Sequence, residues 1–369
     1  MIDINEVLFP HEKIREVQDN MILDVKNAIQ NKKNMILHAP TGIGKTVSVL
    51  GPALSYALKN NLIIFFLTSR HTQHRIVVNT LKQIKKKHKI SFNVGDIIGK
   101  RWMCLQSYAE VMYSGDFADY CKKLREEDKC EFFSNAFRNW KATVKAEKTL
   151  NELKALGPIN VEELMSYCEK EKLCPYEMAA LICKEAKVII ADYYYIFNQN
   201  IRESLFKRIN KELGQCIIIV DEGHNLPVRI RDLLTIKLTN LMVERAVKEA
   251  AKFAKEAVEN LKILNEILIE LSRDLDFNRE EKLVRRENFT GLINKNFNYD
   301  GLIAELSFIG DDVREKQKQS YIGVIAKFLE SWQGPNEGFA RILSKKEFAK
   351  KELISLAYRC LDPSLVTKE

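Results

Sequence analysis

The segment Ala39-Pro40-Thr41-Gly42-Ile43-Gly44-Lys45-Thr46 decides the expected fold of this 369-residue chain. It joins a short apolar run at residues 34–39, which predicts a strand, to a stretch of helical spacing at residues 47–58. Glycines let such a loop turn tightly and aim its N–H groups at phosphate oxygens, and the helix that follows adds its positive end. Lys45 can reach the outer phosphates of a nucleotide, and Thr46 can ligate Mg²⁺. The expected phosphate-binding residues are Thr41, Gly42, Ile43, Gly44, Lys45 and Thr46.

A second apolar run, Cys216–Val220, leads directly into Asp221-Glu222-Gly223-His224. A buried parallel strand would deliver these residues to the carboxyl edge of a sheet, where open α/β sheets bind ligands. Asp221 can then hold Mg²⁺, and Glu222 can orient and deprotonate an attacking water. His224 lies too far along the turn to be an obvious catalyst, and the alternative to a functional role is a surface histidine. Together the loop and the acidic strand end predict a nucleotide-hydrolysing site.

Helix and strand signals alternate before residue 100. Residues 12–27 and 75–88 have helical spacing, and residues 62–67 form the continuous apolar run expected of a buried parallel strand. Strand signals return at Val188–Ala191. This βαβ order predicts an α/β fold, a P-loop NTPase (RecA-like) parallel sheet with helices on both faces.

Two stretches break this pattern and predict inserted domains. Between residues 99 and 175 the apolar strand runs disappear, and five of the eight cysteines occur there. Residues 228–290 contain neither Gly nor Pro, and their apolar residues recur at helical spacing. We expect a long amphipathic helix there, and further helices at Tyr321–Trp332 and at residues 345–358.

Composition limits the class of protein. Hydrophobic residues make up 46% and charged residues 29%, so a packed core is available and a disordered chain is excluded. No apolar run approaches the roughly 20 residues of a membrane span, and residues 1–7 do not resemble a signal peptide. We expect a soluble intracellular protein without a membrane contact. Its net charge of +8 favours a polyanionic partner such as DNA or RNA, although many intracellular proteins are equally basic.

Eight cysteines in an intracellular chain indicate free thiols or metal ligands rather than disulfides. There is no Cys-x-x-Cys, so their spacing leaves Zn²⁺, an iron–sulfur cluster and plain buried thiols all open. The candidate ligands are Cys104, Cys121, Cys130 and Cys174. Those expected to be small buried hydrophobic residues are Cys183, Cys216 and Cys360.

Several of these motifs resemble the XPD family of superfamily-two DNA helicases. Three segments resemble that family's iron–sulfur domain: Lys100-Arg101-Trp102-Met103-Cys104-Leu105, Cys130-Glu131-Phe132-Phe133 and Leu173-Cys174-Pro175-Tyr176-Glu177. Elsewhere the resemblance extends to Arg15-x-x-Gln18, Ala191-Asp192-Tyr193-Tyr194-Tyr195-Ile196-Phe197 and Asp221-Glu222-Gly223-His224. It covers residues 9–235 and returns near Cys360.

The resemblance implies ATP and Mg²⁺ as cofactors, and ATP-driven 5′→3′ unwinding of DNA in nucleotide excision repair. It implies a 4Fe–4S cluster whose ligands are Cys104, Cys121, Cys130 and Cys174. Cys168 is an alternative to Cys174, which we prefer for its Cys-Pro-Tyr context. The resemblance also places Arg15 and Gln18 at the nucleotide, and it makes His224 a link between nucleotide state and nucleic acid.

The implied domains are motor domain 1 at residues 1–99 and 176–235, an iron–sulfur domain at 100–175, a helical Arch domain at 236–345 and a return toward motor domain 1 at 346–369. Single strands usually lie in basic grooves beside aromatic platforms. We expect the DNA contacts to be Arg70, His71, Lys170, Lys172 and Tyr193. Tyr193 can equally be a core residue, and the basic run at residues 85–89 is more simply a solvated helix end.

A helicase also needs a second motor domain, and the chain stops at Glu369, where that sequence should begin. We therefore expect a truncated protein that binds ATP weakly and hydrolyses it poorly. The expected partners are single-stranded and forked DNA and other repair proteins, and the expected state is a cytoplasmic, nucleoid-associated monomer of archaeal type. The alternatives are a zinc-stabilised nucleic-acid-binding module with a nucleotide switch, and a repair ATPase that does not unwind DNA.

Overall fold

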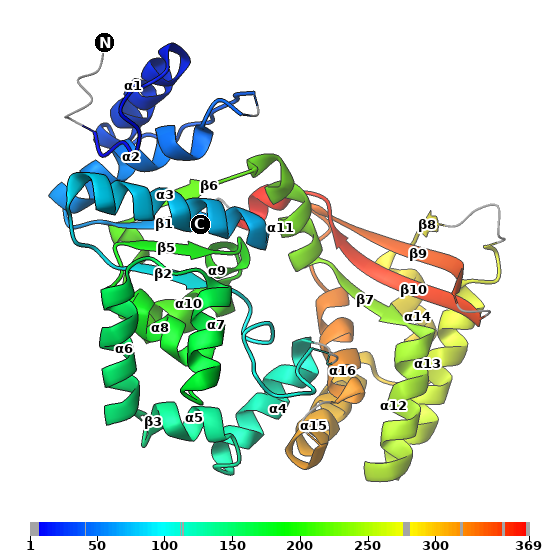
Figure 1. Cartoon of the computed structure of the whole chain (residues 1–369). Helices are drawn as coiled ribbons and strands as arrows, with labels where there is room; N and C mark the ends of the chain where they lie inside the picture. Colours follow the sequence, from blue (N-terminus) through cyan, green and yellow to red (C-terminus); the bar gives the residue numbers. More distant parts are fainter. Residues whose placement is uncertain are drawn as a thin grey trace. The chain divides into compact units, whose positions relative to one another are not determined.

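The computed structural model describes residues 7–40, 42–110, 112, 114–275, 281–317, 320–348 and 351–366. The chain divides into two compact units, Met1–His224 and Asn225–Glu369 (Figure 1). Among the described helices, none has both the length and the hydropathy that a membrane span requires.

The first unit is built on a parallel sheet of four strands in the order β2–β5–β1–β6. The strands are β1 (Ile63–Leu67), β2 (Val94–Ile97), β5 (Val188–Ala191) and β6 (Cys216–Val220). Since every pair is parallel, the four carboxyl ends meet at one edge of the sheet. The prediction of an α/β fold with a parallel sheet is confirmed.

The helices and short strands of this unit precede, connect and follow the sheet strands. They are α1 (Glu16–Gln30), α2 (Lys45–Lys59), α3 (His71–His88), α4 (Ser114–Glu126), α5 (Glu131–Ala136), β3 (Phe137–Arg138), β4 (Lys141–Ala142), α6 (Val144–Leu156), α7 (Val161–Lys170), α8 (Pro175–Glu185), α9 (Tyr194–Phe197), α10 (Gln199–Ile209), η2 (Leu213–Gln215) and η3 (Gly223–Asn225), the last of which ends at the boundary between the units.

Helices cover both faces of this sheet, because its strands are apolar on both sides. On one face Phe66 of β1 belongs to a buried cluster with Leu54 of α2 and Leu81 of α3. On the other face Phe65 stacks on Phe206 of α10, with ring centroids 5.2 Å apart. The sheet is therefore packed against helices on both faces.

The expected strand at residues 34–39 is absent from the structure, and this prediction was wrong. The segment is unpaired, and the side chain of Ile36 is 99% exposed. Its apolar run is only Met35-Ile36-Leu37, flanked by polar residues, so pairing would bury little surface at the sheet edge. Strand β6 is correspondingly half-buried along its whole length.

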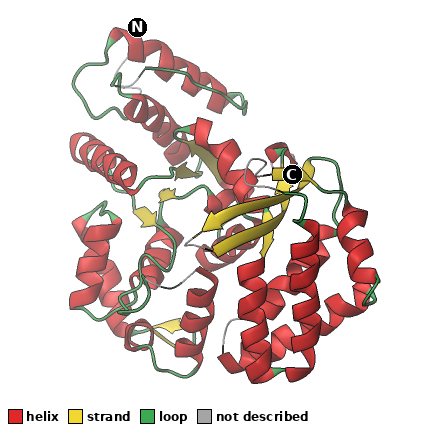
Figure 2. Ribbon diagram, turned by 90° about the vertical axis from the view of Figure 1, so that its right-hand side faces the viewer, coloured by secondary structure: helices red, strands yellow, loops and turns green. Residues whose placement is uncertain are grey.

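The second unit combines helices with an antiparallel sheet of order β7–β10–β9–β8. The long β9–β10 hairpin crosses the helices in Figure 2. The elements are α11 (Leu226–Leu234), β7 (Ile236–Thr239), α12 (Asn240–Phe253), η4 (Lys255–Ala257), α13 (Val258–Leu271), β8 (Glu281–Leu283), α14 (Arg286–Asn294), α15 (Tyr299–Gln317), α16 (Tyr321–Trp332), β9 (Phe339–Phe348), β10 (Lys351–Cys360) and η5 (Pro363–Val366).

Two sequence-based predictions for this unit were wrong, and one was confirmed. Residues 228–290 do not form one helix, since strand β7 follows α11 and the backbone at Ala254 (φ −154°, ψ 70°) separates α12 from η4. Residues 345–348 and 351–358 lie in β9 and β10 rather than in a helix, because Ile354, Leu356 and Tyr358 alternate inward with a period of two. The helix predicted at Tyr321–Trp332 is α16.

Candidate functional site

The glycine loop precedes α2 and has the backbone of a phosphate-binding turn. Gly42 and Gly44 have φ values of +84° and +88°, a region that glycine enters without the steric cost of a Cβ atom. Gly44 is the N-cap of α2, and a Cβ atom there would lie 2.4 Å from Nε2 of Gln18. Lys45 and Thr46 begin the helix, where backbone N–H groups have no partner within the helix. Thr41 lies outside the described residues.

The start of α1 supports this loop from behind. Gln18 is buried, and its Nε2 donates a 2.8 Å hydrogen bond to the carbonyl of Ile43. Its Oε1 accepts a 3.0 Å hydrogen bond from the backbone N–H of Arg15. The guanidinium of Arg15 donates to the carbonyl of Gly42 at 3.4 Å. Both residues therefore contact the loop backbone, and contact with a nucleotide stays a prediction.

The acidic residues follow β6 at the carboxyl edge of the sheet. The backbone N–H of Asp221 donates to the carbonyl of Leu67, the last residue of the neighbouring strand β1, at 2.9 Å. Partial burial and the nearby Glu222 carboxylate raise the pKa of Asp221, while the positive charge of Lys45 acts in the opposite direction. The Lys45 ammonium also donates to the carbonyl of Ala39 at 3.2 Å. Lys45 and Asp221 are thus close enough to interact electrostatically.

Glu222 and His224 interact with each other beyond Asp221. Glu222 has a φ of +51°, which is uncommon for a residue with a side chain and is concentrated at functional sites. Nδ1 of His224 lies 3.3 Å from a carboxylate oxygen of Glu222, and the imidazole is 72% exposed. His224 is therefore a surface histidine that still reaches the candidate general base.

Tyr193 has a different role from the one expected. Its side chain is 1% exposed, so no base can stack on its ring in this structure. Its hydroxyl donates to the carbonyl of Asp221 and, at 3.2 Å, to that of Glu222. We therefore reassign Tyr193 from a DNA contact to a residue that holds the acidic turn. The sequence reasoning missed this role because no local signal reports a contact between residues so far apart in the chain.

The other expected DNA contacts lie at two places in the first unit. Arg70 is exposed in the loop after β1 and is the N-cap of α3. The backbone of His71 opens α3, and its side chain lies outside the described residues. Lys170 is exposed at the end of α7, whereas the ammonium of Lys172 pairs with Glu131 at 3.0 Å. Their contact with DNA stays a prediction.

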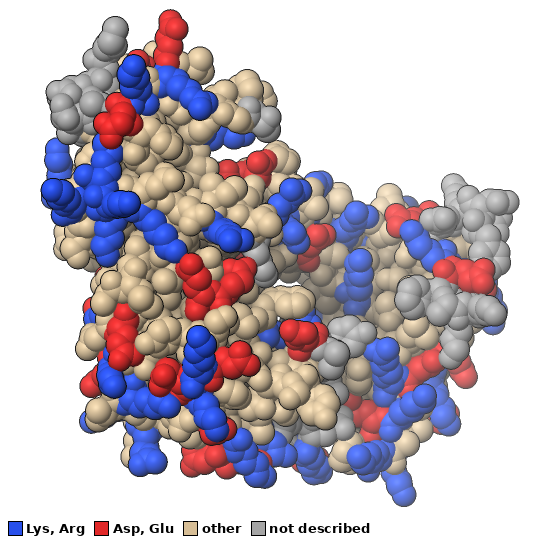
Figure 3. Space-filling view, in the orientation of Figure 1, with Lys and Arg blue, Asp and Glu red and all other residues tan. Residues whose placement is uncertain are grey.

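The basic run at the end of α3 has structural partners. Figure 3 shows Lys and Arg side chains gathered at the left edge of the view, beside α3. Lys87 donates to the carbonyl of His11 at 2.6 Å, and a ring nitrogen of His88 lies 2.9 Å from the carbonyl of Phe9. These contacts favour the interpretation as a helix end that ties down the start of the chain.

Four cysteines line one hollow, which we call the cysteine hollow. Its lining residues are Lys100, Cys104, Leu105, Phe117, Cys121, Arg125, Cys130, Phe132, Phe133, Cys174, Pro175, Tyr176 and Glu177. Its empty volume is about 370 Å³, part of it open to solvent. Cys168, the alternative ligand, is fully buried elsewhere and does not line it. The hollow therefore brings together all four of the preferred cysteines.

The thiols of the cysteine hollow influence one another. Burial raises the pKa of Cys104, and the nearby Cys121 and Cys130 raise it further. Burial likewise raises the pKa of Cys174, with smaller contributions from Glu177 and Cys121. Within the described residues, no three His, Cys, Asp or Glu side chains converge closely enough to hold a single metal ion. The four thiols are the donor type that both Zn²⁺ and iron–sulfur clusters take, so the donor set alone does not distinguish the two.

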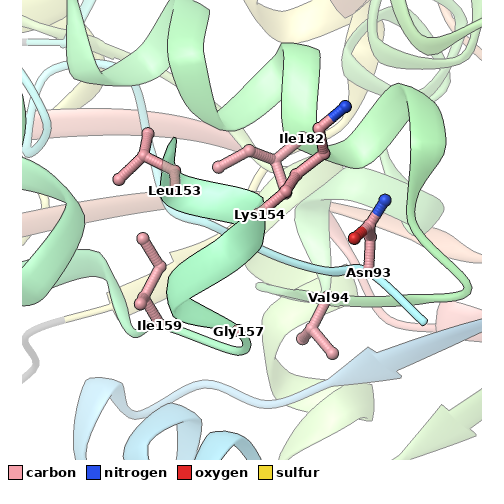
Figure 4. Close-up of a pocket in the computed structure, with 7 residues that line it drawn as sticks. All are labelled: Asn93, Val94, Leu153, Lys154, Gly157, Ile159 and Ile182. Atoms are coloured by element: carbon pink, nitrogen blue, oxygen red, sulfur yellow. The ribbon is translucent and has the colours of Figure 1, made fainter. Parts of the chain in front are cut away.

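A second small hollow lies between β2, the end of α6 and α8 (Figure 4). Its lining is mostly apolar, and its one charged side chain, Lys154, pairs with Glu185 at 2.9 Å. None of the predicted site residues lines it, so we assign it no function.

Comparison with known proteins identifies relatives along most of the chain. The DEAD_2 family matches residues 66–243, and the family described as type III restriction enzyme, res subunit, matches residues 11–110. The general transcription and DNA repair factor IIH helicase subunit XPD/RAD3 of Saccharomyces cerevisiae is 26% identical over 272 residues. That alignment covers 68% of this chain and 33% of the yeast protein.

An archaeal relative and a solved structure extend the match. The ATP-dependent DNA helicase XPD of Sulfolobus acidocaldarius is 26% identical over 327 residues, or 86% of this chain and 50% of that protein. A solved structure described as "Truncated XPD" has a TM-score of 0.59 at 19% identity and covers 96% of this chain and 89% of its own. The structural likeness establishes the fold. The chain spans a third to a half of the length of the two curated relatives.

Proposed function

Because the chain belongs to the XPD/RAD3-type helicase family, we propose that it forms an ATP-binding and DNA-engaging part of an ATP-dependent DNA helicase. The observation that carries the proposal is the placement of the glycine loop at the start of α2 and of Asp221 at the end of β6, near enough for the charge of Lys45 to lower the pKa of Asp221. A lysine on a glycine loop and a carboxylate at a strand end are the two halves of a nucleotide–Mg²⁺ site. The unit has a parallel sheet with Asp221 directly after β6 and the glycine loop directly before α2, which supports the proposal, while no strand precedes the loop.

In the proposed site, the N–H groups at the start of α2 and the ammonium of Lys45 hold the phosphates of ATP. The hydroxyl of Thr46 and the carboxylate of Asp221 would hold Mg²⁺, which neutralises charge on the phosphates when bound. Glu222 accepts the proton of the attacking water. The imidazole of His224 orients the Glu222 carboxylate, and Tyr193 fixes the backbone from which both acids project.

Nucleotide binding by this chain tests the proposal directly. Lys45→Ala removes the ammonium that meets the phosphates, so we expect affinity for ATP with Mg²⁺ to fall at least tenfold in calorimetric titration. Lys59→Ala is the matched control, because Lys59 carries the same charge at the far end of the same helix. Equal affinities of the wild type and Lys45→Ala would refute the phosphate-loop assignment.

We also propose that the cysteine hollow binds a 4Fe–4S cluster through Cys104, Cys121, Cys130 and Cys174. Thiolates are the usual ligands of such clusters. The thiols, which burial keeps protonated in the free protein, lose their protons when the cluster binds. The four thiols line one hollow, and the family resemblance favours a cluster there over Zn²⁺. The cationic side chains of Lys100 and Arg125 line the same hollow and would offset the charge of the thiolates.

Metal analysis of anaerobically purified protein distinguishes the cluster from zinc. We expect about four iron and four sulfide per chain, falling sharply in Cys104→Ser. Cys216→Ser is the control, since Cys216 lies outside the hollow and its Sγ donates to the carbonyl of Glu212 as a serine hydroxyl could. A colourless protein with one zinc per chain would favour the zinc-stabilised binding module instead.

The finer assignments of the family extend the proposal to 5′→3′ movement, nucleotide excision repair and association with other repair proteins. Among the DNA contacts, Arg70 and Lys170 are exposed cations and suit a phosphate backbone. Direction is tested by strand displacement on duplexes with a single 5′ or 3′ tail, using a polypeptide that spans the full length of the relatives. Displacement from 3′-tailed substrates alone would contradict the proposed direction.

A further inference from the structure

The β3–β4 hairpin carries the most exposed tryptophan of the described residues. Its strands, Phe137–Arg138 and Lys141–Ala142, are joined by the two-residue turn Asn139-Trp140 (β3 is labelled in Figure 1). The side chain of Trp140 is 77% exposed. We call Arg138, Asn139, Trp140 and Lys141 the hairpin tip.

The backbone of the hairpin tip is unfavourable for this sequence. Asn139 and Trp140 have φ values of +50° and +61°, as in the type I′ turns that favour Asn followed by Gly. Asparagine tolerates this region, but a bulky side chain with a positive φ is an outlier. A glycine at position 140 would form the same turn at lower conformational cost, so the requirements of the turn do not explain a tryptophan there.

The charges of the hairpin tip are unfavourable as well. Arg138 pairs directly with Lys141 across the two strands, and like charges in that register repel each other. Both side chains are exposed, and neither forms an ion pair within the described part of the chain. An exposed indole, a strained turn and two opposed cations thus coincide in one small hairpin. Such a concentration of locally costly choices is typical of a binding site.

We infer that the hairpin tip binds single-stranded nucleic acid, with an unpaired base stacked on Trp140 and phosphates between Arg138 and Lys141. Any base offers a π-face to an indole, and a phosphate relieves the repulsion of the opposed cations. This inference deepens the proposed function and rests on it. The charge complementarity favours a polyanion over an apolar protein partner.

The ring of Trp140 is braced from behind, which suits a stacking platform. Its edge packs on Phe133, with ring centroids 6.2 Å apart and planes at 70°. Phe133 stacks in turn on Phe137, and the guanidinium of Arg125 lies 5.3 Å from its ring centroid. Because Phe133 is buried and also lines the cysteine hollow, the platform is attached to the packed part of the segment. A braced ring loses little freedom when a base stacks on it.

The first arm of the test measures stacking. Binding of a fluorescein-labelled oligothymidylate by the full chain is followed by anisotropy, and Trp140→Ala should weaken it about tenfold, at the lower end of base–aromatic stacking energies. Phe308→Ala is the matched control, since Phe308 is also aromatic and 77% exposed but lies in α15. Blunt duplex DNA, which offers no unpaired base, should bind Trp140→Ala and wild type alike.

The second arm measures charge. The double variant Arg138→Gln, Lys141→Gln removes two phosphate contacts. A plot of the logarithm of the association constant for the single strand against the logarithm of the salt concentration should therefore become less steep by about 1.4. Lys248→Gln with Lys295→Gln removes two exposed cations from the second unit and should leave the slope unchanged. Unaltered circular dichroism and ATP affinity in every variant show that the fold is intact.

The outcomes separate the inference from the proposed function. If wild type binds the oligonucleotide and Trp140→Ala binds it equally well, the platform is refuted and the helicase proposal stands. Equal loss of single-strand and duplex affinity in Trp140→Ala would also refute stacking. If wild type binds neither ATP nor the oligonucleotide, the proposed function and the inference fall together.

Discussion

Asp221 shows the conflict between function and stability at a single residue. Burial raises its pKa above the ordinary aspartate value of 3.8, so ionisation disfavours the folded chain. Asn is similar in shape and carries no charge. We therefore expect Asp221→Asn to unfold at a higher urea concentration than wild type at pH 7, while its affinity for Mg²⁺ and ATP falls.

The pH dependence of that difference has a defined sign. In the unfolded chain Asp221 loses its proton near its ordinary pKa, and in the folded chain it loses it at higher pH. As the pH rises from the pKa of Asp221 in the unfolded chain to its pKa in the folded chain, the wild type therefore loses stability relative to Asp221→Asn. Above that range the difference in stability stays constant. Urea midpoints of both proteins measured from acid to neutral pH check this. A difference that shrinks as the pH rises would contradict it.

Tyr193 provides a second prediction for the same turn. Tyr193→Phe removes the hydroxyl that donates to the carbonyls of Asp221 and Glu222, and leaves both with one partner fewer. We expect a loss of about 1 kcal/mol in the free energy of unfolding, and weaker binding of ATP with Mg²⁺. Tyr194→Phe is the matched control, as its hydroxyl has no such contact among the described residues. Unchanged nucleotide affinity in Tyr193→Phe would show that the turn at Asp221 and Glu222 keeps its conformation without these hydrogen bonds.

Among the elements, the crossing of α15 and α16 depends on two glycines. A Cβ atom on Gly310 would lie 2.5 Å from Cα of Gly323 and 2.7 Å from its nitrogen, where only backbone can yield. We expect Gly310→Ala to lower the free energy of unfolding by about 1–3 kcal/mol, the usual cost of overpacking. The same change at Gly291 in α14 meets nothing within 4 Å and should stabilise by about 0.5–1 kcal/mol. Denaturant titration of both variants tests the contact, and equal effects would contradict it.

The elements that could be predicted are those with a strong local pattern. The apolar runs of β1, β5 and β6 predicted a buried parallel sheet because a strand buried on both faces must be apolar throughout. The β9–β10 hairpin was missed although Ile354, Leu356 and Tyr358 alternate, because neighbouring apolar residues also satisfied a helical period. The strand expected at residues 34–39 did not form, because a run of three apolar residues buries too little surface to hold the segment at the sheet edge.

The site could be predicted where its chemistry is contiguous in sequence. The glycine loop and the pair Asp221-Glu222 could be recognised, because each is a short contiguous motif whose residues suit the binding of phosphate or Mg²⁺. The clamp by Tyr193 and the hairpin tip at Trp140 could not be predicted, since one needs a distant contact and the other a backbone angle. The gathering of four cysteines around one hollow followed from family resemblance rather than from their spacing.

On the scale of the whole molecule, the second unit contains all the parts of an independent fold. All residues of its buried cluster, which includes Phe289, Phe328 and Trp332, lie within residues 238–358. All four strands of its sheet belong to the same unit. The buried Glu249 of α12 accepts hydrogen bonds from the hydroxyl of Ser320 at 2.6 Å and the N–H of Tyr321 at 2.8 Å. These contacts cap α16 and satisfy donors that would otherwise be buried without partners.

We therefore predict that residues 225–369, produced alone, fold cooperatively. Trp332 is the single tryptophan of this segment and is fully buried, so its emission should be blue-shifted and should move to the red in one urea transition that coincides with circular dichroism. Glu249→Ala should lower the free energy of unfolding of the isolated segment by about 1–3 kcal/mol, because the start of α16 loses its acceptor. An exposed tryptophan without a transition would mean that this core needs the rest of the chain to form.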